Sequence, residues 1–164
     1  PGEIGTIYMT AGLGEFEYHK DPDKTRSVKR DGMITAGDLG HLTAEGWLYI
    51  SDRRTDLILS GGVNIYPAEI EAVLVTHPLV ADAAVFGVPD PDWGETVQAV
   101  IEPIPGVQGT DALAEEIRAF AAEHLARYKL PRYIDFSDAL PRLPSGKLLK
   151  RRLKDEYAAR FKAG

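Results

Sequence analysis

The apolar positions in the first 50 or so residues fall in short clusters of residues that prefer strands. One cluster runs from Ile4 to Thr10. Another, from Gly46 to Ile50, follows the turn-forming sequence Thr-Ala-Glu-Gly. We therefore predict that this part of the chain is rich in β structure.

The pattern changes after residues 52–56. Two short apolar segments, Leu57–Ser60 and Val63–Ile65, flank Gly61-Gly62, which suits a tight hairpin because glycine adopts positive φ without a β-carbon clash. Pro67 then occupies a helix start, and Glu69 lies where the helix dipole favours negative charge. The buried stripe of this helix is predicted to consist of Ile70, Val73 and Leu74.

Strands and a further helix are predicted in the remainder. Strands are expected at residues 81–88 and 96–101, with the turn cluster Pro89–Asp92 between them, and a third short strand at 133–136. The intervening helix, at 110–125, has an apolar face formed by Leu113, Ile117, Phe120 and Ala121. The predicted class is α+β: a small sandwich domain from about Thr55 onward, preceded by the β-rich fragment.

The composition, 44% hydrophobic and 27% charged residues, is that of a soluble globular protein. No apolar run approaches the roughly 20 residues that cross a bilayer, and no signal pattern opens the chain, so a cytoplasmic location is the default expectation. The absence of cysteine excludes disulfides, thiolate metal sites and a cysteine nucleophile. No metal site is predicted, because metal-ligand spacing is lacking among the four histidines, His19, His41, His77 and His124.

The net charge of −6 argues against a nucleic-acid partner, but the charge is unevenly distributed. Seven basic and two acidic residues lie between Lys147 and Lys162. One interpretation is a solvated basic helix from Lys150 to Lys162. The other is attraction to the phosphates of a nucleotide ligand.

Two blocks of sequence carry more information than any single motif. The first block runs from Gly37 to Glu71 and contains an acidic turn, two adjacent arginines, a double-glycine turn and a helix start. Its sequence is GDLGHLTAEGWLYISDRRTDLILSGGVNIYPAEIE. The second block, PRLPSGKLLKRRL, runs from Pro141 to Leu153. In this order and spacing the blocks resemble the adenylate-forming superfamily, which includes acyl-CoA synthetases, aryl-CoA ligases, peptide-synthetase adenylation domains and luciferases.

The resemblance implies a C-terminal part of a longer enzyme, because the Ser/Thr/Gly-rich loop ending in Pro-Lys-Gly, which wraps the ATP phosphates in the family, does not occur here. Residues 1–53 would end the β-rich barrel of the missing N-terminal large domain, 54–56 would form a hinge, and 57–164 would form the small C-terminal domain. The loop Pro144–Lys147 is not a P-loop, since it lacks the earlier glycine and the following Ser/Thr. We expect this chain alone to be inactive.

Asp38 and Arg53 are the predicted nucleotide-binding residues. A carboxylate in a glycine-flanked turn can accept hydrogen bonds from a vicinal diol, although an isolated Gly-Asp would more often cap its own turn. By resemblance, Asp38 binds the ribose of ATP and Arg53 helps to hold the nucleotide. Thr55 matches the pivot of the small domain, where the family usually has Asp or Lys; an uncharged hydroxyl cannot make the same ion pair.

Lys147 is the predicted catalytic residue. Gly146 lets the backbone approach a ligand, and an ammonium group on a flexible stem can reach developing negative charge. A surface lysine usually has no such role. By resemblance, however, Lys147 steadies the α-phosphate and the acyl carboxylate during adenylation.

Four further residues are predicted to bind CoA by resemblance. Gly62 would leave room for the pantetheine arm, and Trp93 matches an aromatic residue near the CoA site of some aryl-CoA ligases. Simpler interpretations are a hairpin turn for Gly62 and a core-covering loop residue for Trp93. Tyr128 and Lys129 lie in a segment that approaches CoA in relatives.

The implied function is that of an ATP-dependent acyl-CoA synthetase, which joins a carboxylic acid to AMP and then exchanges AMP for the CoA thiol. Forming the adenylate activates the carboxylate, because AMP is a far better leaving group than oxide. Mg²⁺ would neutralise the triphosphate through ligands outside this chain. The segment Glu15–Pro22 resembles that of the fatty, steroid or bile-acid CoA ligases, which implies a fatty or related acyl substrate. The alternatives are an adenylation domain that loads a carrier protein and a non-catalytic binding module.

Overall fold

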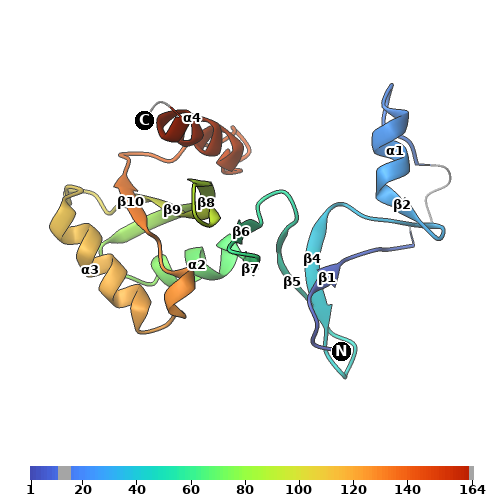
Figure 1. Cartoon of the computed structure of the whole chain (residues 1–164), viewed down its shortest axis with the longest axis horizontal. Helices are drawn as coiled ribbons and strands as arrows, with labels where there is room; N and C mark the ends of the chain where they lie inside the picture. Colours follow the sequence, from blue (N-terminus) through green and yellow to red (C-terminus); the bar gives the residue numbers. More distant parts are fainter. Residues whose placement is uncertain (11–15, 163–164) are drawn as a thin grey trace. The chain divides into compact units, whose positions relative to one another are not determined.

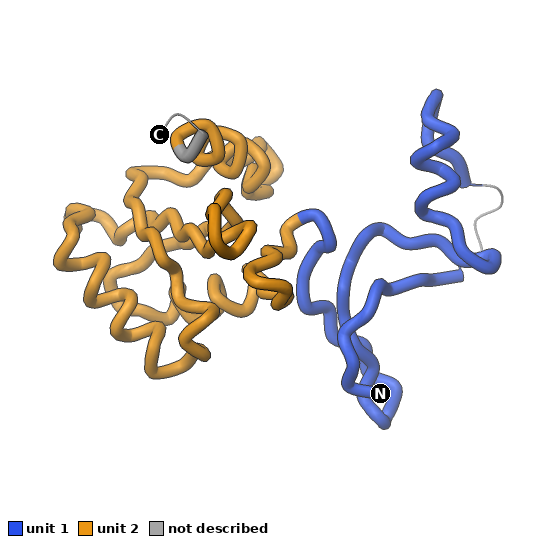
Figure 2. The backbone as a smooth tube through the Cα atoms, in the orientation of Figure 1, with its two compact units in different colours: residues 1–55 blue, residues 56–164 orange. Residues whose placement is uncertain are grey.

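The computed structural model describes residues 1–10 and 16–162, so Glu15 of the segment that favours a fatty acyl substrate lies outside the described residues. The chain divides into two compact units, residues 1–55 and residues 56–164 (Figure 2). The boundary falls inside the predicted hinge. That residues 54–56 act as a hinge remains a prediction.

Unit 1 contains a three-stranded antiparallel sheet and a two-stranded ribbon (Figure 1). The sheet has the order β1-β4-β5, with bounds Gly5–Thr6, Asp38–Leu42 and Leu48–Arg53. The ribbon pairs β2 (Lys29–Arg30) with β3 (Met33–Ile34). The strand expected over Ile4–Thr10 is therefore reduced to β1 and an isolated bridge between Met9 and Ile34.

Unit 1 also holds a helix, α1 (Pro22–Val28), where the sequence pattern predicted only β structure. The Asp21 carboxylate accepts a hydrogen bond of 3.0 Å from the backbone N–H of Lys24. Proline at the first helical position has its φ already fixed for a helix, and its missing N–H needs no partner there. The prediction was wrong here because this capping signal was overlooked.

Unit 2 is built on a five-stranded mixed sheet. Its strands are β6 (Ile58–Ser60), β7 (Val63–Ile65), β8 (Val80–Asp90), β9 (Gly94–Pro103) and β10 (Tyr133–Phe136). β9 pairs antiparallel with β8 along its length and parallel with β10. β8 continues through Pro89 and Asp90, which pair with Glu95 and Gly94, so the predicted turn at Pro89–Asp92 is shorter than expected.

Helices cover both faces of this sheet (Figure 1). One core joins β8 and β9 to α2 (Pro67–Leu74) and α3 (Asp111–Ala122), which ends three residues before the predicted end at Leu125. The other core packs α4 (Lys150–Lys162) on the opposite face. A 3₁₀ turn, η1 (Arg127–Lys129), precedes β10.

Alternation along β8 explains the two cores. Val85 faces α2 and α3, whereas its neighbours Ala84 and Phe86 face α4. Ile70, Leu74 and Ile117 are fully buried, and burying one such side chain contributes roughly 1.5–3 kcal/mol. The predicted α+β class is confirmed. Across residues 1–10 and 16–162, no helix is both long and apolar enough to cross a membrane.

Candidate functional site

Asp38 and Arg53 lie side by side at one end of the β4–β5 pair. They are opposite each other in the register, and Arg53 Nε lies 3.6 Å from Asp38 Oδ1. Gly37 has φ +86°, and its carbonyl accepts a hydrogen bond of 2.8 Å from the backbone N–H of Arg54. These two features fix the turn before Asp38. The Arg53 side chain is 56% exposed, so an accessible guanidinium flanks a carboxylate, an arrangement that suits sugar hydroxyls beside a phosphate.

Thr55 is exposed in the turn that links β5 to β6, and it is the last residue of unit 1. This position is compatible with a pivot.

Lys147 projects from a tight loop between Arg142 and Leu148, which form a β-bridge. Leu143 and Lys147 close the loop through an N–H to carbonyl hydrogen bond of 2.8 Å, and Gly146 has φ +83°, which disfavours any other residue. Lys147 is exposed and takes part in no ion pair with the described residues. Its ammonium group is therefore available to an anionic ligand.

Arg142 ties this loop to the sheet. Its guanidinium donates to the Gly146 carbonyl at 2.6 Å and forms an ion pair with Asp82 of β8. Planar guanidinium groups suit such two-partner contacts. The sequence prediction missed Arg142 and Asp82, although Arg142 lies within the second recognised block.

Two lysines of the basic helix α4 fit neither earlier interpretation, whereas Arg151 and Arg152 of the same helix are 95% and 66% exposed. Lys150 Nζ lies 2.8 Å from Glu71 of α2, and Lys154 Nζ lies 2.9 Å from Glu95 of β9. The Lys150 side chain is only 18% exposed. These two lysines, four residues apart on one helix face, thus bind carboxylates of unit 2, so they are neither freely solvated nor open to phosphates.

The predicted CoA residues Gly62 and Trp93 belong to two adjacent turns. Gly61 and Gly62 have φ +56° and +81°, and the Gly61 N–H donates to the Trp93 carbonyl at 2.8 Å. A β-carbon on Gly61 would lie 2.6 Å from Trp93 Cε3, whereas one on Gly62 would meet no described atom within 4 Å. Trp93 remains 58% exposed. The indole thus lies against Gly61, and the space beside Gly62 is open.

Trp93 is also fixed from its own turn. Its N–H and that of Asp92 both donate to Asp90 Oδ1 at 3.0 Å. Asp90 is buried and also pairs with Arg132. The backbone beneath the indole is therefore rigidly held.

Tyr128 and Lys129 have different surroundings in η1. Lys129 Nζ binds both oxygens of Glu69, at 2.6 and 2.7 Å, and this hydrogen bonding raises the pKa of Lys129. The Lys129 charge is thus already paired with a carboxylate of unit 2. Tyr128 is 55% exposed, so its ring can stack on a ligand. In the described part of the chain, no three His, Cys, Asp or Glu residues cluster closely enough to hold a metal ion.

Comparison with known proteins identifies the architecture. Residues 69–147 match the AMP-binding enzyme C-terminal domain. A fatty acid–[acyl-carrier-protein] ligase of Streptomyces coeruleorubidus is 43% identical over 96% of this chain and 30% of its own length. The chain belongs to the adenylate-forming superfamily.

Two further members extend the comparison. A long-chain-fatty-acid–CoA ligase of Mycobacterium tuberculosis is 42% identical over 94% of this chain and 30% of its own length. The o-succinylbenzoate CoA synthetase of Bacillus subtilis, solved with its acyl-adenylate intermediate, superposes with a TM-score of 0.83 at 41% identity, over 94% of this chain and 31% of that one. This chain thus spans about 30% of the length of these relatives.

Proposed function

We propose that this chain works within a longer ATP-dependent acyl-CoA synthetase, which activates a carboxylic acid as acyl-AMP and transfers the acyl group to CoA. The observation that carries the proposal is Lys147, an exposed cation that forms no ion pair within residues 1–10 and 16–162, on a loop that Arg142 pins to the sheet. An ammonium group held in this way stabilises negative charge that develops on an acyl carboxylate and an α-phosphate.

The nucleotide would be held by Asp38 and Arg53. The Asp38 carboxylate accepts hydrogen bonds from the ribose hydroxyls, and the adjacent guanidinium binds nucleotide oxygens. Mg²⁺, which would neutralise the triphosphate, is expected to take its ligands from the remainder of the enzyme, because the described residues offer no carboxylate cluster for it.

The acceptor thiol would pass along the hairpin at Gly61-Gly62. The open space beside Gly62 suits a narrow pantetheine arm, and the exposed rings of Trp93 and Tyr128 offer apolar and stacking surface to the rest of CoA. Lys129 would not bind CoA through its charge, since its ammonium group is hydrogen-bonded to Glu69; it would instead help to hold the segment that carries Tyr128.

Unit 1 exposes a short apolar segment. The residues Trp47–Ile50, which lead into and form the start of β5, are about half exposed or more, with Trp47 at 70% and Ile50 at 67%. Successive side chains of a strand point to opposite faces, so both faces of this segment present exposed apolar side chains, and such exposed apolar surface marks an interaction site. We propose that the missing large domain covers it, and that Thr55 lies at the joint on which unit 2 pivots.

A carrier protein is the second candidate acceptor, favoured by the relative that acts on an acyl-carrier protein. A phosphopantetheine arm presents the same thiol in both cases, so the hairpin would serve either. The relatives named fatty acid ligases favour a fatty or related acid as the substrate.

The test is to measure the two half-reactions separately in the longer enzyme. Lys147→Ala should reduce acyl-AMP formation on the order of 10²-fold or more, because a preorganised charge is lost from the transition state. Thioester formation from supplied acyl-AMP and CoA should survive. Arg151→Ala, which removes a 95% exposed cation from nearby α4, should leave both steps unchanged.

Equal losses in both half-reactions, or in neither, would remove Lys147 from the proposed mechanism. Replacing CoA by a phosphopantetheinylated carrier protein in the second step distinguishes the two acceptors. Failure of the wild-type enzyme to form acyl-AMP from any carboxylic acid would refute the function itself.

A further inference from the structure

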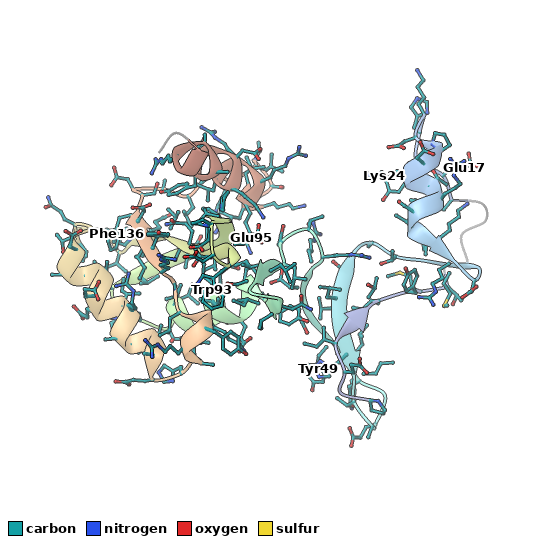
Figure 3. The ribbon with its side chains drawn as sticks, in the orientation of Figure 1. Glu17, Lys24, Tyr49, Trp93, Glu95 and Phe136 are labelled. Atoms are coloured by element: carbon teal, nitrogen blue, oxygen red, sulfur yellow. The ribbon has the colours of Figure 1, made fainter. Side chains whose placement is uncertain are left out.

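The carboxylate of Glu95 connects three elements of unit 2 beside the β6–β7 hairpin (Figure 3). Glu95 belongs to β9, next to the turn that carries Trp93. Its Oε2 accepts the backbone N–H of Leu59 in β6 at 3.0 Å, and its Oε1 accepts a hydrogen bond from Lys154 Nζ of α4 at 2.9 Å. A single side chain thus links the hairpin to the C-terminal helix.

The contact with β6 replaces a missing part of the sheet. Among the described residues, β6 pairs with β9 at one position, Ser60 opposite Gly94. The Leu59 N–H, just before this pair, bonds to the Glu95 side chain where a longer ladder would supply a backbone carbonyl. With the Gly61 N–H bonded to the Trp93 carbonyl, two backbone donors fix the hairpin to the β8–β9 turn.

Space and charge hold Glu95 in this conformation. A β-carbon on Gly87 of β8 would lie 2.8 Å from the Glu95 carboxyl carbon, so glycine there makes room for the carboxylate. The Lys154 ammonium group neutralises it, and such charge-assisted hydrogen bonds are stronger than neutral ones. The Glu95 side chain is 27% exposed, so the pair is only partly screened by water.

We propose that Glu95, held by Lys154, is a positioning residue for thioester formation. By binding the backbone of β6, it fixes the position of the Gly61-Gly62 turn relative to β9, and the acceptor thiol passes along this turn. This inference rests on the proposed function of the hairpin. The Lys147 loop is anchored separately, through Arg142 and Asp82. Disturbing Glu95 should therefore affect the second half-reaction and spare the first.

The chain contains a closely matched control in Glu71 of α2. Its Oε1 accepts the Val85 N–H of β8 at 2.7 Å, and its carboxylate pairs with Lys150 of α4. Glu71 thus makes the same two kinds of contact as Glu95, a backbone N–H of a strand and a lysine of α4, but neither of these contacts is to the hairpin. Glu71→Ala and Glu95→Ala should lower stability to a similar degree.

The experiment compares the two variants in the longer enzyme. Glu95→Ala should slow thioester formation from supplied acyl-AMP on the order of tenfold, mainly through kcat, since a small misplacement of a reacting group is costly. Acyl-AMP formation should stay within about twofold of wild type, a change too small to reflect a lost transition-state contact. Glu71→Ala should leave both steps near wild type under conditions in which both variants are folded.

Two conservative variants complete the design. Glu95→Gln keeps an oxygen for the Leu59 N–H and should recover most of the second-step rate, whereas Lys154→Met should show a milder form of the Glu95→Ala defect. If Glu95→Ala does not fold, Lys154→Met decides the question.

Equal effects of Glu95→Ala and Glu71→Ala on both steps would overturn the positioning role while leaving the proposed function intact. A normal second-step rate in Lys154→Met, with Glu95→Ala unfolded, would do the same. A wild-type enzyme that forms no thioester would instead refute the function on which the inference rests.

Discussion

The two glycines of the β6–β7 turn should differ in their tolerance of alanine, although they are neighbours and both have positive φ. Gly61 has φ +56° and Gly62 has φ +81°. At either position, alanine in a left-handed conformation lowers the free energy of unfolding by roughly 1–2 kcal/mol. Only at Gly61 would the new methyl group also meet another side chain, 2.6 Å from Trp93 Cε3.

That contact sets the expected difference. Forcing a methyl group into filled space costs about 1–3 kcal/mol when neighbouring groups must move. Because Trp93 is 58% exposed, its indole can swing outward, which favours the lower part of this range. We therefore expect Gly62→Ala to lower the free energy of unfolding by about 1–2 kcal/mol, and Gly61→Ala to cost at least about 1 kcal/mol more.

The measurement is urea unfolding of the 164-residue chain, followed by circular dichroism, for both variants with and without Trp93→Ala. Removing the indole should reduce the cost of Gly61→Ala to that of Gly62→Ala, giving a coupling energy of about 1 kcal/mol or more in the double-mutant cycle. Equal costs for the two glycines in the presence of Trp93, or no coupling, would show that the indole does not pack on Gly61.

Two further predictions concern the loop and the C-terminal helix. Arg142→Ala should reduce acyl-AMP formation about tenfold by loosening the loop that presents Lys147, with Arg142→Lys in between; unchanged adenylation kinetics would contradict this anchoring role. Burial, reinforced by the Asp135 carboxylate, raises the pKa of Tyr157, so the folded state holds this proton more tightly. The free energy of unfolding should therefore fall as the pH rises above about 10 towards the folded-state pKa, and Tyr157→Phe should lack this part of the decline in unfolding measured across that range.

Local signals in the sequence predicted much of unit 2. The hairpin, the strand at 133–136 and the helix Lys150–Lys162 all occur as expected, because double glycine, β-rich clusters and helical charge patterns act over a few residues. β8 extends into the predicted turn because of its pairing with a neighbouring strand. Pairing with β9 continues through Pro89, which needs no backbone donor at that position.

The anchors of the site could not be predicted in the same way. Asp82 and Arg142 are 60 positions apart in the sequence, and Glu95 and Lys154 are 59 apart. No period or motif links such residues, because their contact arises only when α4 and the preceding loop pack on the sheet. The acidic and basic residues were visible in the sequence, but their pairing was not.

These long-range pairs give unit 2 two separately held working parts. The loop of Lys147 is fastened to β8 through Asp82, and the glycine hairpin is fastened to β9 through Glu95. Effects of substitutions are expected to add when the sites share no partner, and within the described part of the chain these two anchors have none in common. A variant of either anchor should therefore impair one half-reaction alone, and the double variant Asp82→Asn with Glu95→Ala should show both defects, each at its single-variant size. A larger combined loss in either step would mean that the loop and the hairpin are coupled through the sheet.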